Sequence, residues 1–339
     1  MRKSVPLFTV IILLTCMTLS ISSCGCGFDC NNGNNRDEPT LLSLGFSDAI
    51  PEELKQVVIE VDSITFKRTG AENVVIDAFT IDALGLVDAD SFQIDLLQYR
   101  GRNQLLVIDN LELDKGTYSE ILITLIDGDI NFSYAQQSDD SLKQINAPAA
   151  GLSLAGITLS EAAGKYTVEF GLAQSLQYQS SSDDYLLAVD GIHIEDNATA
   201  ASLSGRVDST LFNTVSPCNE KVDPESGNRV YLFAGTGLTS EQLADVFTSA
   251  SSSTIPADSQ APFSVAALVK NSLIGSWEYA FGFLPPGTYT MAFACDTFTD
   301  GPVNYDGLVV PLPTDQIYEI TLSDAEQKVC DINSSAVCE

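Results

Sequence analysis

The sequence is poor in positive charge. Its 339 residues include 16 Lys and Arg against 46 Asp and Glu, a formal net charge of −30. Nucleic-acid binding needs clustered Lys and Arg to meet phosphates, so we expect no nucleic-acid partner. The same acidity disfavours direct adsorption to anionic lipid headgroups and is most simply explained by solubility in a salty medium.

Histidine and the common catalytic motifs are also scarce. No Gly-x-Ser-x-Gly or His-Glu-x-x-His pattern occurs, and the single histidine is His193, in a predicted strand at 192–194 followed by Glu195 and Asp196. His193 could be a general base or a metal ligand, but a strand residue on a polar face is the simpler interpretation. Glycosidases use a pair of carboxylates, but this chain has so many Asp and Glu residues that the sequence alone does not single out such a pair. We therefore predict no enzymatic activity and no catalytic residues.

No hydrophobic run reaches the roughly 20 residues that cross a membrane. Residues 6–19 are almost wholly apolar and follow Arg2 and Lys3, which is typical of a signal peptide. Residues 19–24 then read LSISSC, which resembles the lipobox of bacterial lipoproteins. The resemblance implies cleavage before Cys24 and acylation of Cys24, with palmitate or similar chains. The alternative is an ordinary cleaved signal with an incidental cysteine.

The lipobox resemblance also implies a location. Two or more acyl chains hold a protein stably to a membrane, at roughly 0.8 kcal/mol for each buried CH₂. Gly25 follows the cysteine, whereas Asp at that place tends to retain enterobacterial-type lipoproteins in the inner membrane. The resemblance therefore favours the outer membrane of a Gram-negative envelope, on the periplasmic or the external face. Residues 24–40 are rich in Asn and Gly and are expected to form a flexible tether.

Cysteine is infrequent, and no two cysteines have CxxC spacing. Beyond Cys16 in the signal and Cys24 at the anchor, six remain as disulfide candidates: Cys26, Cys30, Cys218, Cys295, Cys330 and Cys338. An even number fits three disulfides in an oxidising compartment, although six cysteines allow fifteen pairings. The expected pairs are Cys218–Cys295, Cys330–Cys338 and Cys26–Cys30. A zinc site is the weaker alternative, because only one histidine is present.

From residue 41 onward the pattern is that of β-strands. Residues 57–61 alternate, and the apolar positions continue on the opposite phase at 64–66, which predicts a bulge at 62–63 or burial on both faces. Residues 105–113 and 121–126 are apolar on both phases, as expected of central strands.

Helix signals are few. Residues 47–54 resemble a short helical start, with Pro and acids in the first turn. Thr239 and Gln242 have capping-box spacing ahead of apolar residues at 243–247, which predicts a second short helix. The polar stretch 136–144 is predicted to be a loop.

The second half contains the clearest predicted hairpin. Residues 277–283 and 289–295 alternate on either side of Pro286 and Gly287. The aromatic members are Trp277, Tyr279, Phe281, Phe283, Tyr289 and Phe293. Because they are in phase across the hairpin, we expect them in a core, with a sugar-stacking platform as the alternative. Trp277 is expected to be the most exposed of them.

Acidic and amide side chains gather after this hairpin. The candidates for a calcium site are Asp296, Asp300, Asn304 and Asp306. Oxygen ligands on a Gly-containing loop suit Ca²⁺, but the spacing is not that of an EF-hand, and a solvated turn is the simpler interpretation. No other cofactor is expected.

Two resemblances to known families cover most of the chain. LSLGFSDA at 42–49, VVIEV at 57–61 and LELDKGTY at 111–118 resemble an uncharacterised domain family of bacterial surface and periplasmic lipoproteins. FLPPGTYT at 283–290, with GRV at 205–207, resembles carboxypeptidase-regulatory-like, transthyretin-like β-sandwiches. The second resemblance implies a non-catalytic spacer or binding module.

Together these patterns predict a mainly β protein with two β-sandwich domains in tandem and one or two short helices. The expected parts are a signal peptide (1–23), Cys24 and the tether (24–40), a first sandwich (41–200), a second (201–325) and a C-terminal tail (326–339). We expect a membrane-anchored envelope lipoprotein with a structural or ligand-binding role. The alternatives are a carbohydrate- or polymer-binding module and an enzyme of unrecognised type. A polysaccharide or an envelope protein is the expected partner, and the sequence leaves the oligomeric state open.

Overall fold

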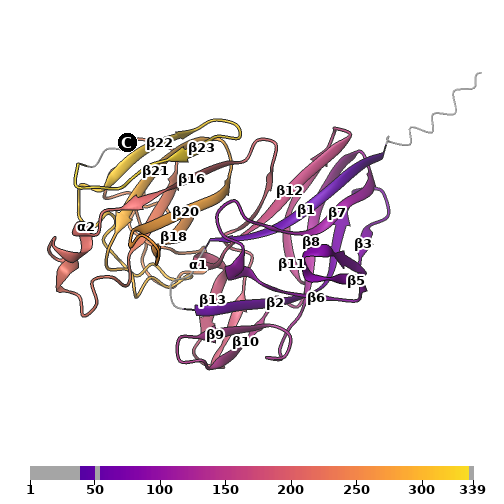
Figure 1. The fold of residues 1–339 in the computed structure, drawn as a ribbon, viewed down its shortest axis with the longest axis horizontal. Helices are drawn as coiled ribbons and strands as arrows, with labels where there is room; N and C mark the ends of the chain where they lie inside the picture. Colours follow the sequence, from indigo (N-terminus) through magenta and orange to yellow (C-terminus); the bar gives the residue numbers. More distant parts are fainter. Residues whose placement is uncertain (1–38, 50–53, 336–339) are drawn as a thin grey trace, which may run out of the picture. The chain divides into compact units, whose positions relative to one another are not determined.

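The structure, a computed structural model, describes residues 39–49 and 54–335. The expectations for the signal peptide, Cys24, Cys26, Cys30 and Cys338 lie outside these residues. So does the predicted tether, except for Pro39 and Thr40, which belong to the first strand, β1 (Pro39–Ala49). No helix in the described part of the chain is both long and apolar enough to cross a membrane. The fold is mainly β, as predicted (Figure 1).

Two packed sheets form the first sandwich. One contains, in order, β15 (Ile192–Asp196), β12 (Ala163–Gly171), β1 (Pro39–Ala49) and β7 (Leu105–Asp114). The other contains β11 (Leu152–Leu159), β8 (Gly116–Ile126), β2 (Leu54–Lys67), β9 (Tyr134–Gln137), β10 (Leu142–Asn146), β14 (Asp184–Leu187) and β13 (Leu176–Gln179). On β2 also lie β3 (Val74–Ile76) and β6 (Phe92–Asp95), while β4 (Phe79–Ile81) pairs with β5 (Leu86–Ala89).

The second sandwich has two four-stranded sheets. The first contains β19 (Val269–Lys270), β20 (Trp277–Leu284), β16 (Ala201–Val207) and β23 (Gln327–Val329). The second contains β18 (Ser264–Ala267), β17 (Arg229–Ala234), β21 (Gly287–Ala294) and β22 (Ile317–Leu322). The helices among the described residues are single turns: α1 (Leu172–Ser175), α2 (Thr210–Asn213), and the 3₁₀ turns η1 (Asp82–Leu84), η2 (Leu96–Gln98) and η3 (Cys218–Glu220).

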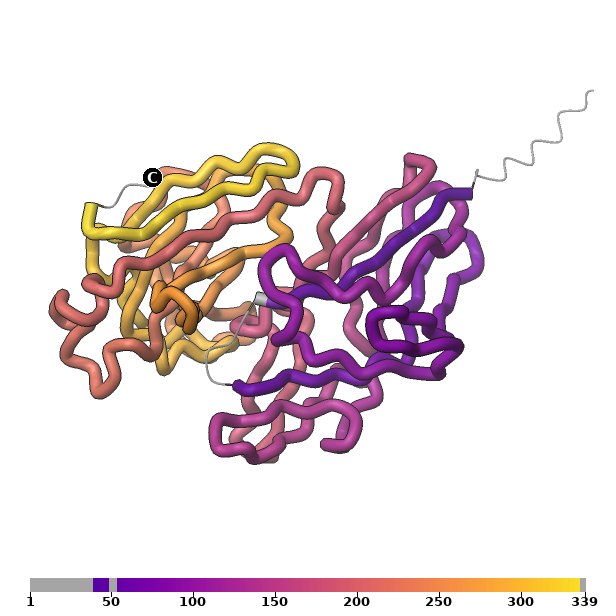
Figure 2. Tube along the Cα trace, in the orientation of Figure 1, coloured from indigo at the N-terminus to yellow at the C-terminus, as the bar shows by residue number. Residues whose placement is uncertain are grey.

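Each sandwich has its own core. Buried residues between 42 and 187 form one cluster, and those between 201 and 332 form two. The chain passes from the first core to the second near residue 200, as the colour change along the tube in Figure 2 shows. Residues 37–339 nevertheless make one compact unit, so the domain boundary at 200 and 201 stays a prediction.

Strand periodicity is explained by burial. In β1, Leu42, Leu44 and Phe46 alternate and point into the first core. The predicted bulge in β2 is confirmed, because its pairing with β8 shifts register between Val61 and Ser63. The extra residue keeps the apolar positions on both sides of the bulge facing one core. The strand at 121–126 is central as predicted, whereas β7 is an edge strand, so the prediction for 105–113 was wrong.

The predicted hairpin at 277–295 is also wrong. Strands β20 and β21 belong to different sheets and face each other across the core (Figure 1). In such an arch the two consecutive strands join different sheets, whereas in a hairpin they pair side by side. Both arrangements give the same alternation, because each strand turns one apolar face to the same core. Tyr279, Phe281, Phe283, Tyr289 and Phe293 are buried as expected. Trp277 is half-buried and is the most exposed of the set.

Both predicted helices are absent from the described residues. Residues 47–49 belong to β1, and 50–53 lie outside the description. At 239–247 the chain turns: the backbone N–H of Thr239 donates to Gln242 Oε1 (3.0 Å), which is half of a capping box. The N–H of Val246 donates to Asp300 instead of closing a helical turn. The predicted loop at 136–144 forms part of the hairpin β9–β10.

Candidate functional site

The sheet β15-β12-β1-β7 has a polar face that is nevertheless buried. On β12, Thr167 and Glu169 are 0% and 2% exposed. Glu169 lies opposite Ser47 of β1 and His193 of β15. Thr167 lies opposite Glu195. Along β12 the residues Thr167 and Glu169 alternate with apolar residues, but alternation does not reveal that another layer covers the polar side.

Burial favours the neutral form of the acids on this face. Burial raises the pKa of Glu169 to about 8, and the charge of Glu195 adds to the rise, against a hydrogen bond with Ser47 that lowers it. Burial likewise raises the pKa of Glu195 to about 7, with a contribution from Asp196. Oε2 of Glu169 is buried without a hydrogen-bond partner in the described chain. An ionised Glu169 would therefore lack the donors that a buried carboxylate requires.

His193 lies at the edge of this polar face, where the second sandwich meets it. Its Nε2 is 3.3 Å from the carbonyl oxygen of Phe283 and 3.9 Å from Glu195 Oε1. Its ring centroid is 5.1 Å from that of Phe263. Burial lowers the pKa of His193, so the neutral ring donates to the carbonyl. His193 is on a strand, as predicted, and its surroundings position a contact between the sandwiches.

The joint between the sandwiches is closed by backbone approach as well. A Cβ on Gly282 of β20 would lie 1.9 Å from the carbonyl oxygen of Gly101. Arg102 donates to the carbonyl of Ala200 (3.2 Å), and its guanidinium carbon lies 5.6 Å from the ring centroid of Phe283. The side chain of Gln174 donates to the carbonyl of Pro262 (3.0 Å). No sequence signal identifies these long-range contacts.

A groove runs along the outer face of β20 and β16 beside this joint. It encloses about 550 Å³, with Ala280 and Val269 among its apolar lining. Its polar lining consists of Arg100, Ser204, Arg206, Glu278 and Asp331. A second cavity of about 370 Å³ shares Arg100 and Val269 and reaches Trp277, Lys270 and Leu54. The groove therefore draws residues from both sandwiches.

Trp277 lines the second cavity and is held there by two contacts. Its ring lies edge-on to Phe212 with centroids 5.7 Å apart, and Lys270 Nζ is 5.2 Å from the ring centroid. With the other five aromatic residues buried, the predicted sugar-stacking platform has only Trp277 left to meet a ligand.

Three of the four calcium candidates accept hydrogen bonds from protein donors. Asp300 accepts from the Tyr231 hydroxyl (2.5 Å) and from the N–H of Val246 (3.0 Å). Asn304 accepts from Ser252, and Asp306 accepts from the N–H of Gly301 (2.7 Å). Asp296 is exposed. Within the described residues, no three His, Cys, Asp or Glu side chains are placed to share a metal ion, so the calcium site stays a prediction.

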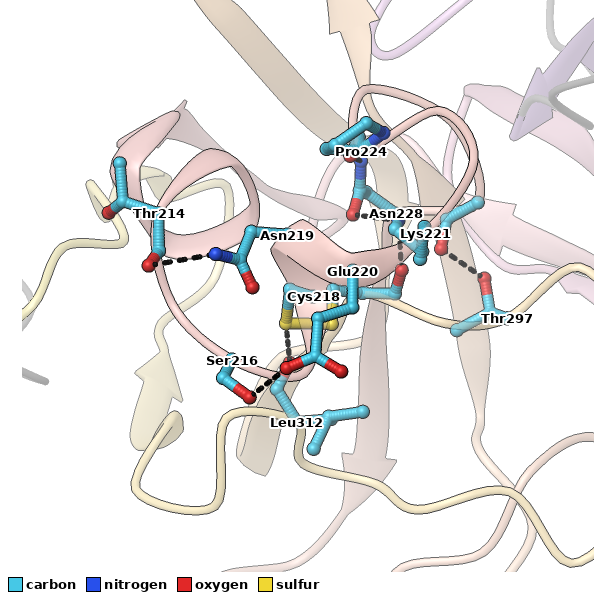
Figure 3. Close-up of a disulfide and its surroundings, with 12 residues drawn as sticks. Thr214, Ser216, Cys218, Asn219, Glu220, Lys221, Pro224, Asn228, Thr297 and Leu312 are labelled. Atoms are coloured by element: carbon cyan, nitrogen blue, oxygen red, sulfur yellow. Dashed lines mark hydrogen bonds between the residues drawn. A yellow bond between two sulfur atoms is a disulfide. The ribbon is translucent and has the colours of Figure 1, made fainter.

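The predicted disulfide between Cys218 and Cys295 is confirmed. It joins η3 to the residue that follows β21, and both cysteines are fully buried (Figure 3). Next to it, Lys221 Nζ donates to Asn228 Oδ1 (3.0 Å) and to the carbonyl of Cys295, which ties the same loop to β21. Cys330 is disulfide-bonded too, and its expected partner lies outside the described residues.

One family model matches part of the chain. Residues 40–188 match the sequence model of a family described as a domain of unknown function, DUF4382. This range coincides with most of the first sandwich and supports the resemblance to an uncharacterised family seen there. The transthyretin-like character of the second sandwich stays a prediction. None of the curated proteins matches the chain.

Several solved structures show a distant likeness. They include the Bacillus anthracis TIE protein (10% identity, 86% of this chain and 33% of that chain, TM-score 0.17). A proposed adhesin from Bacteroides ovatus ATCC 8483 has 8% identity over 94% of this chain and 97% of that chain, with TM-score 0.19. A proposed cell adhesion protein from Bacteroides fragilis NCTC 9343 has 9% identity over 88% and 95%, with TM-score 0.18. This chain thus spans about a third of the TIE protein, and scores this low do not establish a shared fold.

Proposed function

We propose that the protein is a lipid-anchored, non-catalytic binding protein of the bacterial envelope. The observation that carries the extracytoplasmic part is the buried Cys218–Cys295 disulfide, because such bonds form and persist in oxidising compartments. The lipobox at residues 19–24 supplies the means of attachment. Two acyl chains at Cys24 would hold the protein to the membrane, since its acidity disfavours binding to anionic headgroups.

Substitution of the anchor tests this proposal. We expect Cys24→Ala to move the protein from the membrane pellet to the soluble fraction and to abolish incorporation of a labelled fatty acid. Cys16→Ala, within the predicted signal peptide, is the matched control and should leave both unchanged. A Cys24→Ala protein that stays in the pellet, together with a wild-type protein that carries no acyl mass, would rule the anchor out.

The ligand that the groove suits best is a neutral polysaccharide. Its walls carry donors in Arg100, Ser204 and Arg206 and acceptors in Glu278 and Asp331. Sugar hydroxyls both donate and accept, so they match such a mixture, whereas an acidic polymer would be repelled by a net charge of −30. Arg100 is central, because it lines both cavities.

Calorimetry with a panel of neutral oligosaccharides tests the groove. Arg100→Ala should weaken binding roughly tenfold or more, as expected from the loss of a charge-assisted hydrogen bond. Lys143→Ala is the control, because Lys143 pairs with Asp183 elsewhere on the first sandwich. Trp277 is the only tryptophan, so its fluorescence should also report binding. If no neutral oligosaccharide gives heat or a fluorescence change, this ligand class is excluded.

A further inference from the structure

The joint between the sandwiches combines close packing with acids that have few donors. Glu169 is 2% exposed, and its Oε2 has no hydrogen-bond partner in the described chain. Glu195 lies on the neighbouring strand, and its side chain is 15% exposed. Because two like charges on one buried face repel each other and lose their hydration, this arrangement is stable only while the carboxyls hold protons.

We propose that this joint is a proton-operated latch, in which protonated Glu169 and Glu195 let the second sandwich close on the polar face and loss of their protons releases it. The latch is separate from the proposed lipid anchor at Cys24. It acts through contacts that cross the joint, at His193 with Phe283 and at Gly101 with Gly282.

The other charged groups around the joint do not neutralise these acids. On β15, Asp196 adds negative charge beside Glu195. His193 is neutral because burial lowers its pKa, and from β21 Tyr289 stays neutral because burial raises its pKa to about 12. Asp48 of β1 is a further buried acid. From the loop before β7, Arg100 Nε donates to the carbonyl of Leu97.

Arg102, from the same loop, donates a hydrogen bond to the carbonyl oxygen of Ala200. On β12, Lys165 is exposed and Tyr166 donates to the carbonyl of Thr158. Phe283 of β20 and Phe263, which precedes β18, contact His193 on the polar face, and Gly282 of β20 approaches Gly101; none of these residues ionises. The described contacts therefore give no ion pair to Glu169.

The direction of the pH effect follows from the two states. In the open state both acids are hydrated and ionise near their ordinary value of about 4.3. In the closed state the pKa values of Glu169 and Glu195 are about 8 and about 7. At pH values between the open-state and closed-state pKa of each carboxyl, the closed state holds protons that the open state lacks. The equilibrium constant for opening the joint therefore rises with pH. Each carboxyl contributes up to about tenfold per pH unit, and the rise ends near pH 8.

His193 acts in the opposite direction. Its pKa is lowered by burial, so below about pH 6.5 the open state takes up a proton that the closed state refuses. Acidification therefore favours opening through His193, but only below that pH, and there the two acids, which hold two protons in the closed state, outweigh the single proton of His193. The latch is tightest in mildly acidic solution and opens toward alkaline pH.

The latch would also control the groove. Arg100 comes from the first sandwich, while Arg206, Val269 and Ala280 come from the second. Opening the joint separates these walls, so ligand binding should weaken as the pH rises. This last step rests on the proposed polysaccharide function, whereas the latch itself does not.

Hydrogen exchange of the full chain in detergent, from pH 5 to pH 9, tests the latch. After division by the intrinsic exchange rate at each pH, exchange in peptides spanning 191–195, 262–264 and 282–284 should rise with pH and level off near 8. Trp277 emission should change in parallel, because its cavity includes Leu54 and Arg100 of the first sandwich. The double variant Glu169→Gln with Glu195→Gln mimics the protonated acids and should remain closed throughout.

Three further proteins make the test decisive. Glu112→Gln with Glu161→Gln changes the same number of acids at exposed sites and should behave as wild type. Gly282→Ala places a Cβ against Gly101 and should be open even at pH 5. The single variant Glu195→Gln should halve the pH response if the double variant does not fold. Exchange that is independent of pH in the wild type, or a rise that survives undiminished in the Glu169→Gln with Glu195→Gln variant or in Glu195→Gln alone, would overturn the latch. Oligosaccharide binding measured at pH 6 tests the proposed function of the groove, and its outcome does not depend on the result for the latch.

Discussion

At the scale of single residues, buried acids differ widely in how many hydrogen-bond donors and charged partners they have. Asp300 in the second sandwich is fully buried but accepts from Tyr231 and Val246 and lies 3.4 Å from Arg229. Burial raises the pKa of Asp300 to about 6, and these partners limit the rise. Glu169 lacks comparable donors, which is why its pKa lies higher. The difference separates a structural acid from one that can respond to pH.

Removing one partner of Asp300 should be costly. Tyr231→Phe deletes a buried hydroxyl and leaves the carboxylate short of a donor, so we expect the free energy of unfolding to fall by about 1–3 kcal/mol. Urea unfolding at pH 7.5 measures it. Tyr178→Phe is the control, because that hydroxyl bonds Asp183 at 2.6 Å on the surface, and it should change stability by less than about 0.5 kcal/mol. Equal losses in the two variants would refute this account of Asp300.

At the scale of secondary-structure elements, periodicity predicts strands well and their partners poorly. The bulge in β2 follows from alternation that one buried face imposes. The error at β20 and β21 arises because alternation records which face is buried and not which strand lies alongside. The failed helix at 239–247 has a similar cause: the apolar residues Leu243 and Val246 pack on another sheet without forming a helix.

Close strand approach makes one element sensitive to a single methyl group. A Cβ on Gly156 in β11 would lie 1.9 Å from the carbonyl oxygen of Tyr118 in β8. Gly156→Ala should therefore force the two strands apart and lower stability by about 1–3 kcal/mol. Gly287→Ala in β21 is the control, because its nearest contact would be an ordinary 3.8 Å. Thermal unfolding of both variants measures the effect, and an unchanged melting temperature for Gly156→Ala would contradict the predicted clash.

At the scale of the whole molecule, the groove and the burial of the polar face of β12 depend on how two separate cores are joined. Each core forms from its own stretch of chain, between residues 42 and 187 and between 201 and 332. Both features need residues from both stretches. The groove uses Arg100 from the first and Arg206 from the second, and the polar face carries Glu169 from the first and meets Phe283 from the second. A protein with either sandwich alone would lack both features.

The sequence by itself determined the mainly β class and the burial of the aromatic residues in 279–293, because alternation directly reflects which side chains leave water. It also favoured the correct pairing of Cys218 with Cys295 among several alternatives. Only the tertiary structure decided that the polar face of β12 is covered and that His193 contacts the second sandwich. The physical reason is that these properties depend on contacts between residues about 90 positions apart, and local patterns carry no information about such contacts.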